Sequence, residues 1–144
     1  KLRYTIELFM ECYDDAEEVI TKRQDGKVQI VLENIYFDLN KWDIKPDAAR
    51  ILDVLIELLN KYPEMYIEID AHTDSRATAT YNLMLSDRRA KATLEYLVKN
   101  GINRNRLKSK GYGESQPLIE CGKTRICTEQ EHSINRRCEF IILK

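Results

Sequence analysis

The chain has 144 residues, of which 43% are apolar and 33% are charged, and its formal net charge is −1. This length suits one domain, and the balanced charge excludes a general attraction to nucleic acid or to an anionic membrane surface. The longest apolar runs, such as residues 140–143, fall far short of the roughly twenty residues of a transmembrane helix. The sequence opens without Met or a signal-peptide pattern. We therefore expect a piece of a longer protein, with any membrane contact made through a preceding part.

The first 26 residues are expected to be separate from the rest. Residues 3–10 alternate apolar and polar side chains, which predicts a half-buried strand. The polar, acidic stretch 14–26 predicts a loop. We divide the chain into residues 1–26, which are a strand and loop or the linker of an upstream segment, and residues 27–144, which form one domain.

The domain begins with a strand signal followed by a helix signal. Residues 27–37 are rich in Val and Ile and predict a strand, which residues 38–41 end. Pro46 suits the first turn of a helix, and apolar residues then recur at intervals of three and four until Pro63. Residues 65–71 alternate apolar and polar side chains, which predicts a strand with one buried face.

The second half of the domain repeats this alternation. A polar loop at residues 73–80 leads into a helix that Gly101 ends, because glycine is typical just after a helix C-terminus. Residues 107–112 and 137–143 predict two further strands. The helix between residue 80 and Gly101 is expected to bury an apolar face that consists of Leu83, Ala90, Leu94, Leu97 and Val98. The order β-α-β-α-β-β predicts an α+β fold, a two-layer α/β sandwich with helices on one face of a mixed sheet.

Sequence signatures of catalysis and metal binding are missing. The chain contains no GxSxG, P-loop, HExxH or GxGxxG motif. Asp70 and Asp74 lie close in sequence, but paired carboxylates are common on solvated loops. His72, His132 and the four cysteines do not have the spacing of a zinc site. We expect no catalytic residue, no metal and no cofactor.

Residues 72–90 carry the most unusual charge pattern. A strand ends at His72, the loop carries Asp74, and the next helix carries Arg89. Because the end of the strand and the first turns of the helix lie close together, one carboxylate and one guanidinium are expected to face the same cleft. The alternative is an ordinary surface ion pair worth about 0–1 kcal/mol, and spacing alone favours it.

Five short motifs, in order along the chain, resemble those of the OmpA-like C-terminal domain. They are Asn34–Asn40, His72–Asp74, Asn82–Ala90, Gly111–Pro117 and Asn135–Arg137. Each motif is weak alone, but their order and the secondary structure between them make the resemblance specific over residues 27–144. This family is the periplasmic peptidoglycan-binding module of OmpA-type porins, peptidoglycan-associated lipoproteins and flagellar stator proteins.

The resemblance implies non-covalent binding of peptidoglycan through the meso-diaminopimelate of its stem peptide. Asp74 would accept hydrogen bonds from the diaminopimelate ammonium, and Arg89 would hold its carboxylate. The same pocket would be lined by Asn40, Thr73, Asn82 and Arg136. The protein would be a periplasmic domain of an outer-membrane protein that anchors the membrane to the cell wall. The alternatives are a periplasmic structural or protein-interaction domain without glycan binding, and an enzyme acting on cell-wall peptides.

The chemistry of diaminopimelate agrees with this assignment. The end of its side chain carries an ammonium and a carboxylate on one carbon, so a site needs an anion and a cation a few ångströms apart. Arginine pairs a carboxylate through two parallel hydrogen bonds, which lysine does not. One position departs from the family pattern, because Ala77 stands where many members have a glycine. Glycine there would permit a positive φ, so we expect a differently shaped loop around Thr73.

The cysteines predict a small loop closed by a disulfide. Cys121 and Cys127 flank a polar stretch, and a bridge between them implies an oxidising compartment. A bridge from Cys127 to Cys138, a bridge involving Cys12, or free thiols are the alternatives. Cys138 lies on the inward-facing side of the last predicted strand, which favours a buried free thiol.

Overall fold

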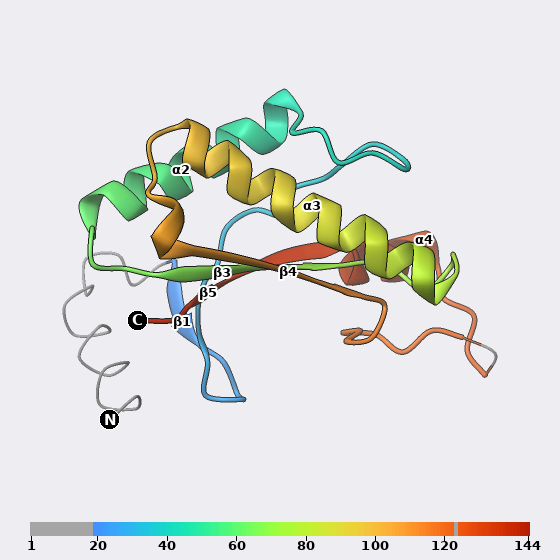
Figure 1. The fold of residues 1–144 in the computed structure, drawn as a ribbon. Helices are drawn as coiled ribbons and strands as arrows, with labels where there is room; N and C mark the ends of the chain where they lie inside the picture. Colours follow the sequence, from blue (N-terminus) through green and yellow to red (C-terminus); the bar gives the residue numbers. More distant parts are fainter. Residues whose placement is uncertain (1–18, 123) are drawn as a thin grey trace.

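The computed structural model describes residues 19–122 and 124–144, which build one five-stranded sheet (Figure 1). The strand order is β1-β2-β5-β3-β4. β3 and β4 are parallel, whereas the other neighbouring strands are antiparallel, so the sheet is mixed as predicted. The strands are β1 (Ile20–Lys22), β2 (Val28–Ile30), β3 (Ile67–His72), β4 (Leu107–Gly113) and β5 (Arg137–Ile142).

Two long helices pack on one face of this sheet, which confirms the predicted two-layer sandwich (Figure 1). Helix α2 (Pro46–Lys61) begins at its proline, and its buried residues recur at intervals of three and four. Helix α3 (Ala79–Lys99) begins after Thr78, whose hydroxyl accepts a hydrogen bond from the Tyr81 amide. The buried faces of both helices and the sheet form the core.

A close approach between α3 and β4 fixes the helix above the sheet. A Cβ atom on Gly111 would lie 2.2 Å from the backbone nitrogen of Asp87, so only glycine fits there. Beside it, the buried Ser86 hydroxyl accepts a hydrogen bond of 2.9 Å from the Gly113 amide. Ser86, Gly111 and Gly113 therefore hold α3 against the sheet, and all three belong to the motifs that resemble those of OmpA-like domains. This matters for the cavity, because α3 carries Arg89.

The strand predicted over residues 27–37 is wrong after Ile30. Beyond that residue the chain leaves the sheet, although Ile35 remains in the core. The side chain of Asn34 then bonds the edge of β5: it donates to the Arg136 carbonyl at 2.7 Å and accepts from the Cys138 amide at 3.3 Å. A side chain thus takes the place of the backbone partner that a longer β2 would have supplied.

The N-terminal part also differs from the prediction. Ile20–Lys22 lies in the stretch predicted to be a loop, but it forms β1 and pairs with β2. The expected domain start at residue 27 follows the tight turn of this hairpin, where Gly26 has a positive φ of 87°. The strand expected at residues 3–10 lies outside the described residues.

Two further differences concern helices. Leu83, expected on the buried face of α3, is 52% exposed, whereas Leu85 is buried. A short helix, α4 (Glu129–Asn135), precedes β5 and was not predicted, and the single turn η2 (Arg104–Arg106) precedes β4. The pattern Thr128-x-x-Glu131 signals the start of α4, because both side chains of this capping box bond the backbone of the other residue.

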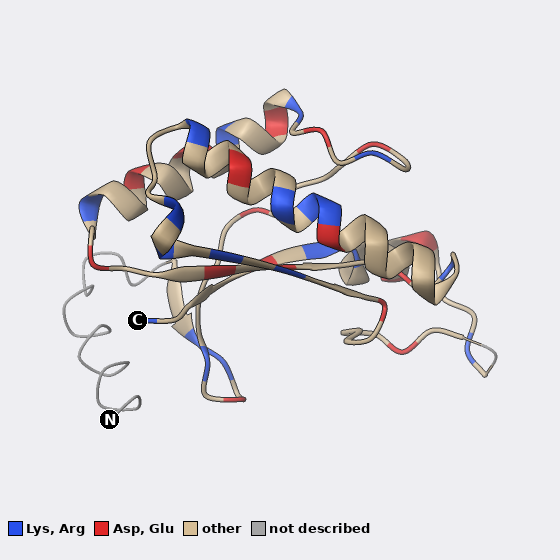
Figure 2. Cartoon of the chain, viewed as in Figure 1, with Lys and Arg blue, Asp and Glu red and all other residues tan. Residues whose placement is uncertain are grey.

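Charged residues interrupt β3 and β4 along their length (Figure 2), where they alternate with core residues. Because successive side chains of a strand point to opposite faces, these charged residues lie on the face away from the helices. Asp70 is only 3% exposed there, and burial together with the neighbouring Glu68 raises the pKa of Asp70 to about 8. His72 Nε2 lies 3.2 Å from Glu139 Oε1, and burial lowers the pKa of His72. Asp70 lies within β3 on this face of the sheet, whereas Asp74 lies in the loop beyond the end of β3. The two carboxyl groups therefore do not form the carboxylate pair that their closeness in sequence suggested.

Candidate functional site

A cavity of about 470 Å³ lies where β3 ends and β5 begins. His72 and Arg137, which face each other across these two strands, both reach its wall. The other walls come from the segment after β2, the loop before α3, the first turns of α3, and α4. The cavity is lined by all six predicted binding residues, namely Asn40, Thr73, Asp74, Asn82, Arg89 and Arg136.

Asp74 is the anionic centre of the cavity. Its Oδ1 accepts from the Arg76 amide at 3.0 Å, and its Oδ2 accepts from Arg76 Nη2 at 2.9 Å and from Arg136 Nη1 at 2.8 Å. Burial alone would raise the pKa of Asp74, but the hydrogen bonds from Arg76 and Arg136 outweigh it and hold the pKa at about 2. Asp74 is therefore a carboxylate at any physiological pH.

Four side chains close into a ring, here called the charge ring: Asp74, Arg76, Glu129 and Arg136. Glu129 accepts from Arg76 Nη1 and from Arg136 Nη2, both at 2.7 Å. Each guanidinium thus bridges the same two carboxylates, and the formal charges of the ring cancel. Arg76 and Glu129 were not among the predicted site residues. The capping box of Thr128 and Glu131 places Glu129 in the first turn of a helix, but a local pattern does not contain its contact with Arg76, 53 residues away.

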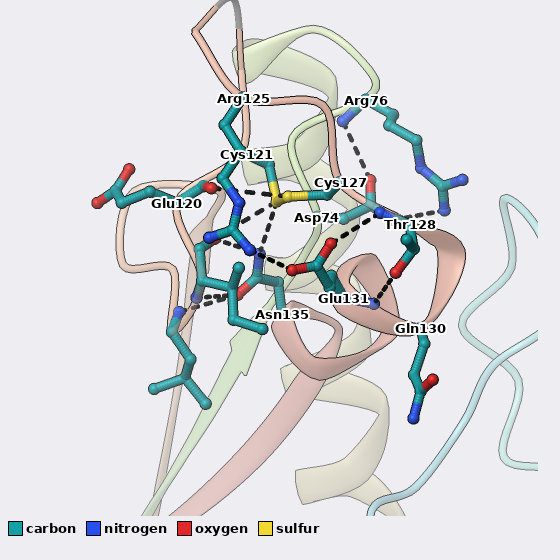
Figure 3. Close-up of a disulfide and its surroundings, with 12 residues drawn as sticks. Asp74, Arg76, Glu120, Cys121, Arg125, Cys127, Thr128, Gln130, Glu131 and Asn135 are labelled. Carbon is teal, nitrogen blue, oxygen red and sulfur yellow. Dashed lines mark hydrogen bonds and ion pairs between the residues drawn. A yellow bond between two sulfur atoms is a disulfide. The ribbon is translucent and has the colours of Figure 1, made fainter.

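The predicted disulfide between Cys121 and Cys127 is present, with the two Cα atoms 5.6 Å apart. Figure 3 shows it beside the start of α4, with Asp74 and Arg76 among the residues drawn around it. The buried side chain of Asn135 accepts from two backbone amides of the preceding loop, at 2.8 and 3.0 Å. Cys138 is a free thiol, so the alternative bridge to Cys127 is wrong, and Cys12 lies outside the described residues.

Arg89 also lines the cavity but is held in another way. Its Nε donates to the Lys41 carbonyl at 2.9 Å, and its Nη2 donates to the Asp38 carbonyl at 3.1 Å. Its guanidinium lies 5.0 Å from the centre of the Phe37 ring. Within residues 19–122 and 124–144, Arg89 forms no ion pair with a carboxylate, so the ordinary surface pair with Asp74 is not formed. Burial lowers the pKa of Arg89, but a guanidinium stays protonated at neutral pH.

The loop under Arg89 owes its shape to Asn40. This residue has a φ of 59° and is, among the described residues, the single non-glycine residue with a positive φ. Its side-chain oxygen accepts a hydrogen bond from the Tyr81 hydroxyl on α3. Ala77 has no positive φ, so its backbone does not need the conformation that glycine would permit. The differently shaped loop expected around Thr73 stays a prediction.

Asn82 and Thr73 shape the cavity from within. The amide nitrogen of Asn82 donates to the carbonyls of Asp74 and Ala77 and to Glu114 Oε1, at 3.1, 3.3 and 2.9 Å. Asn82 thereby positions the loop that carries Asp74. Thr73 is 5% exposed, its amide donates to the Gly113 carbonyl at 2.9 Å, and its hydroxyl has no partner among the described residues.

No three His, Cys, Asp or Glu side chains in residues 19–122 and 124–144 are grouped so that they could hold a metal ion. None of the helices in this part of the chain is long and apolar enough to cross a membrane.

The fold and the cavity define a class: an α+β sandwich domain with a cavity lined by charged side chains at one end of its sheet. The family model of the OmpA family matches residues 36–126. The chain belongs to the OmpA family.

Related proteins carry this domain as part of a longer chain. The peptidoglycan-associated lipoprotein of Rhizobium meliloti (strain 1021) is 42% identical over 99 residues, which are 69% of this chain and 56% of that protein. The outer membrane porin F of Pseudomonas fluorescens is 35% identical over 106 residues, 74% of this chain and 31% of that protein. The chain thus spans about half the length of the lipoprotein and less of the porin.

A solved structure has the same fold. The peptidoglycan-associated lipoprotein from Burkholderia pseudomallei superposes with a TM-score of 0.66 and 25% sequence identity. The match covers 76% of this chain and 88% of that one. The arrangement of strands and helices is therefore that of an OmpA-like domain.

Proposed function

We propose that this domain binds peptidoglycan without covalent chemistry, through the meso-diaminopimelate of the stem peptide. In a protein of the bacterial envelope it would face the periplasm and anchor the outer membrane to the cell wall. The names of the related lipoproteins support binding to peptidoglycan. The charges of the cavity support diaminopimelate as the group that is recognised.

One observation carries this proposal: a single cavity presents the carboxylate of Asp74 and the guanidinium of Arg89. The hydrogen-bond acceptors of Arg89 are backbone carbonyls, which do not cancel its charge. Its remaining nitrogen, Nη1, has no acceptor in the described part of the chain, so it is available to an incoming carboxylate. The ammonium on the same carbon of the ligand would bind Asp74.

The test is calorimetry with two stem peptides that differ at one position, meso-diaminopimelate or lysine. Lysine keeps the side-chain ammonium but lacks the terminal carboxylate, so Arg89 would remain unpaired in its complex. We expect at least tenfold weaker binding of the lysine peptide, because a site built around a polar group penalises an analogue that lacks it. Equal affinities would contradict diaminopimelate recognition. Absence of binding to either peptide would favour a structural or protein-interaction domain.

A further inference from the structure

The carboxylate that the proposed ligand requires is already occupied. Asp74 Oδ2 accepts hydrogen bonds from two guanidiniums, those of Arg76 and Arg136, at 2.9 and 2.8 Å. A carboxylate oxygen offers about two acceptor positions, so both positions of Oδ2 are filled. Oδ1 accepts from the Arg76 amide alone, so it keeps one open acceptor position, but the two guanidiniums neutralise the charge of Asp74. An incoming ammonium gains the full attraction of Asp74 when one of the two arginines gives way.

The structure distinguishes these two arginines. The side chain of Arg76 is 50% exposed and that of Arg136 is 29% exposed. Arg136 directly precedes β5, and its carbonyl is bound by Asn34 at 2.7 Å. Arg76 belongs to the loop before α3, and its second partner Glu129 is 65% exposed. Either arginine would keep Glu129 as a partner, so the difference lies in their exposure. Arg76 leaves Asp74 at the lower cost, because its guanidinium already faces water more than that of Arg136 does.

We propose that Arg76 is an internal substitute for the ammonium of the ligand, and that binding exchanges the guanidinium of Arg76 on Asp74 for this ammonium. The exchange leaves the charge at Asp74 unchanged, so the loop keeps its ionic contact in both states. Arg76 thereby lowers the affinity for every ligand that brings a free ammonium to Asp74. This inference rests on the proposed function, since it concerns the same cavity.

The experiment compares Arg76→Gln with a matched control, Arg125→Gln, by calorimetry on the full chain. Arg125 is 55% exposed and pairs with Glu131 of α4, so its replacement removes the same charge from a similar ion pair outside the cavity. The probes are the meso-diaminopimelate stem peptide and the same peptide acetylated on the side-chain amine. Thermal unfolding confirms that both variants are folded.

We expect Arg76→Gln to bind the diaminopimelate peptide about three- to fivefold more tightly, which is what loss of an exposed ion pair allows. Arg125→Gln should bind it like the original protein. The acetylated peptide should gain nothing from Arg76→Gln, because it brings no ammonium. Unchanged or weaker binding of the diaminopimelate peptide to Arg76→Gln, or an equal gain for the acetylated one, would overturn the exchange. If the original protein binds neither peptide, the proposed function fails as well, which separates the two results.

Discussion

The two walls of the cavity hold their arginines in opposite ways. On one wall, backbone carbonyls and an aromatic ring hold Arg89, and its positive charge remains available. On the other wall, the charge ring lets two carboxylates cancel two guanidiniums. The difference teaches that the exposed fraction of a charged side chain does not measure whether its charge is available to a ligand. The charge of the groups that already bind the side chain decides this. The first wall offers a cation without a carboxylate partner, whereas the second presents a carboxylate whose charge two guanidiniums already cancel.

The largest expected effect comes from removing the available charge. Arg89→Ala should lower the affinity for the diaminopimelate peptide tenfold to a hundredfold, since a charge-assisted hydrogen bond is worth about 1.5–3 kcal/mol. Calorimetry measures the affinity, and circular dichroism checks the fold. The neighbouring Arg88 gives the control, because it lies 4.6 Å from the centre of the Trp42 ring and does not line the cavity. Undiminished binding by a folded Arg89→Ala protein, or an equal loss in Arg88→Ala, would contradict the role of this wall.

An intermediate effect is expected from opening the disulfide behind the charge ring. Cys121 and Cys127 close a short loop, and Cys127 immediately precedes Thr128, which caps α4. Replacing both cysteines by serine should cost about 2 kcal/mol of unfolding free energy, or roughly 5–10 °C of melting temperature. The affinity for the diaminopimelate peptide should change less than twofold, because neither cysteine lines the cavity. A large loss of affinity with an unchanged melting temperature would show that the bridge acts on the ring rather than on the fold.

The smallest expected effect concerns the ionisation of Asp74. Since the pKa of Asp74 in the fold is about 2, below its ordinary value of 3.8, its ionic contacts stabilise the protein above about pH 4. That contribution is lost as the pH falls through 2. Allowing for screening by solvent, Asp74→Asn should be less stable than the original protein by about 1 kcal/mol at pH 7.

Urea unfolding at pH 7, 4 and 2 tests this dependence. The difference between the two proteins should persist at pH 4 and vanish near pH 2. A difference already absent at pH 4 would mean that the charge ring does not lower the pKa of Asp74. The affinity of the original protein for the diaminopimelate peptide should stay constant from pH 7 to pH 4, because Asp74 remains ionised over this range.

Local signals predicted the helices well and one strand poorly. The ends of α2 and α3 follow from Pro46, Pro63 and Gly101, because these residues start or stop a helix wherever it packs. The Val- and Ile-rich stretch after Ile30 has the composition of a strand but no pairing partner, since Asn34 bonds β5 instead. Strand length depends on the neighbouring strand, which a local pattern does not contain.

The sequence by itself predicted the main alternation of strands and helices and the pairing of Cys121 with Cys127, because these depend on residue types at fixed spacing. The six candidate site residues followed from the resemblance of its motifs to those of OmpA-like domains, since spacing alone favoured an ordinary surface pair. Only the tertiary structure decided which charges cancel. Arg76 and Glu129 are 53 residues apart, and their contact exists because α4 packs against the loop that follows β3. Whether a charge is available to a ligand is a property of distances of a few ångströms between distant segments, because ionic hydrogen bonds act only at that range.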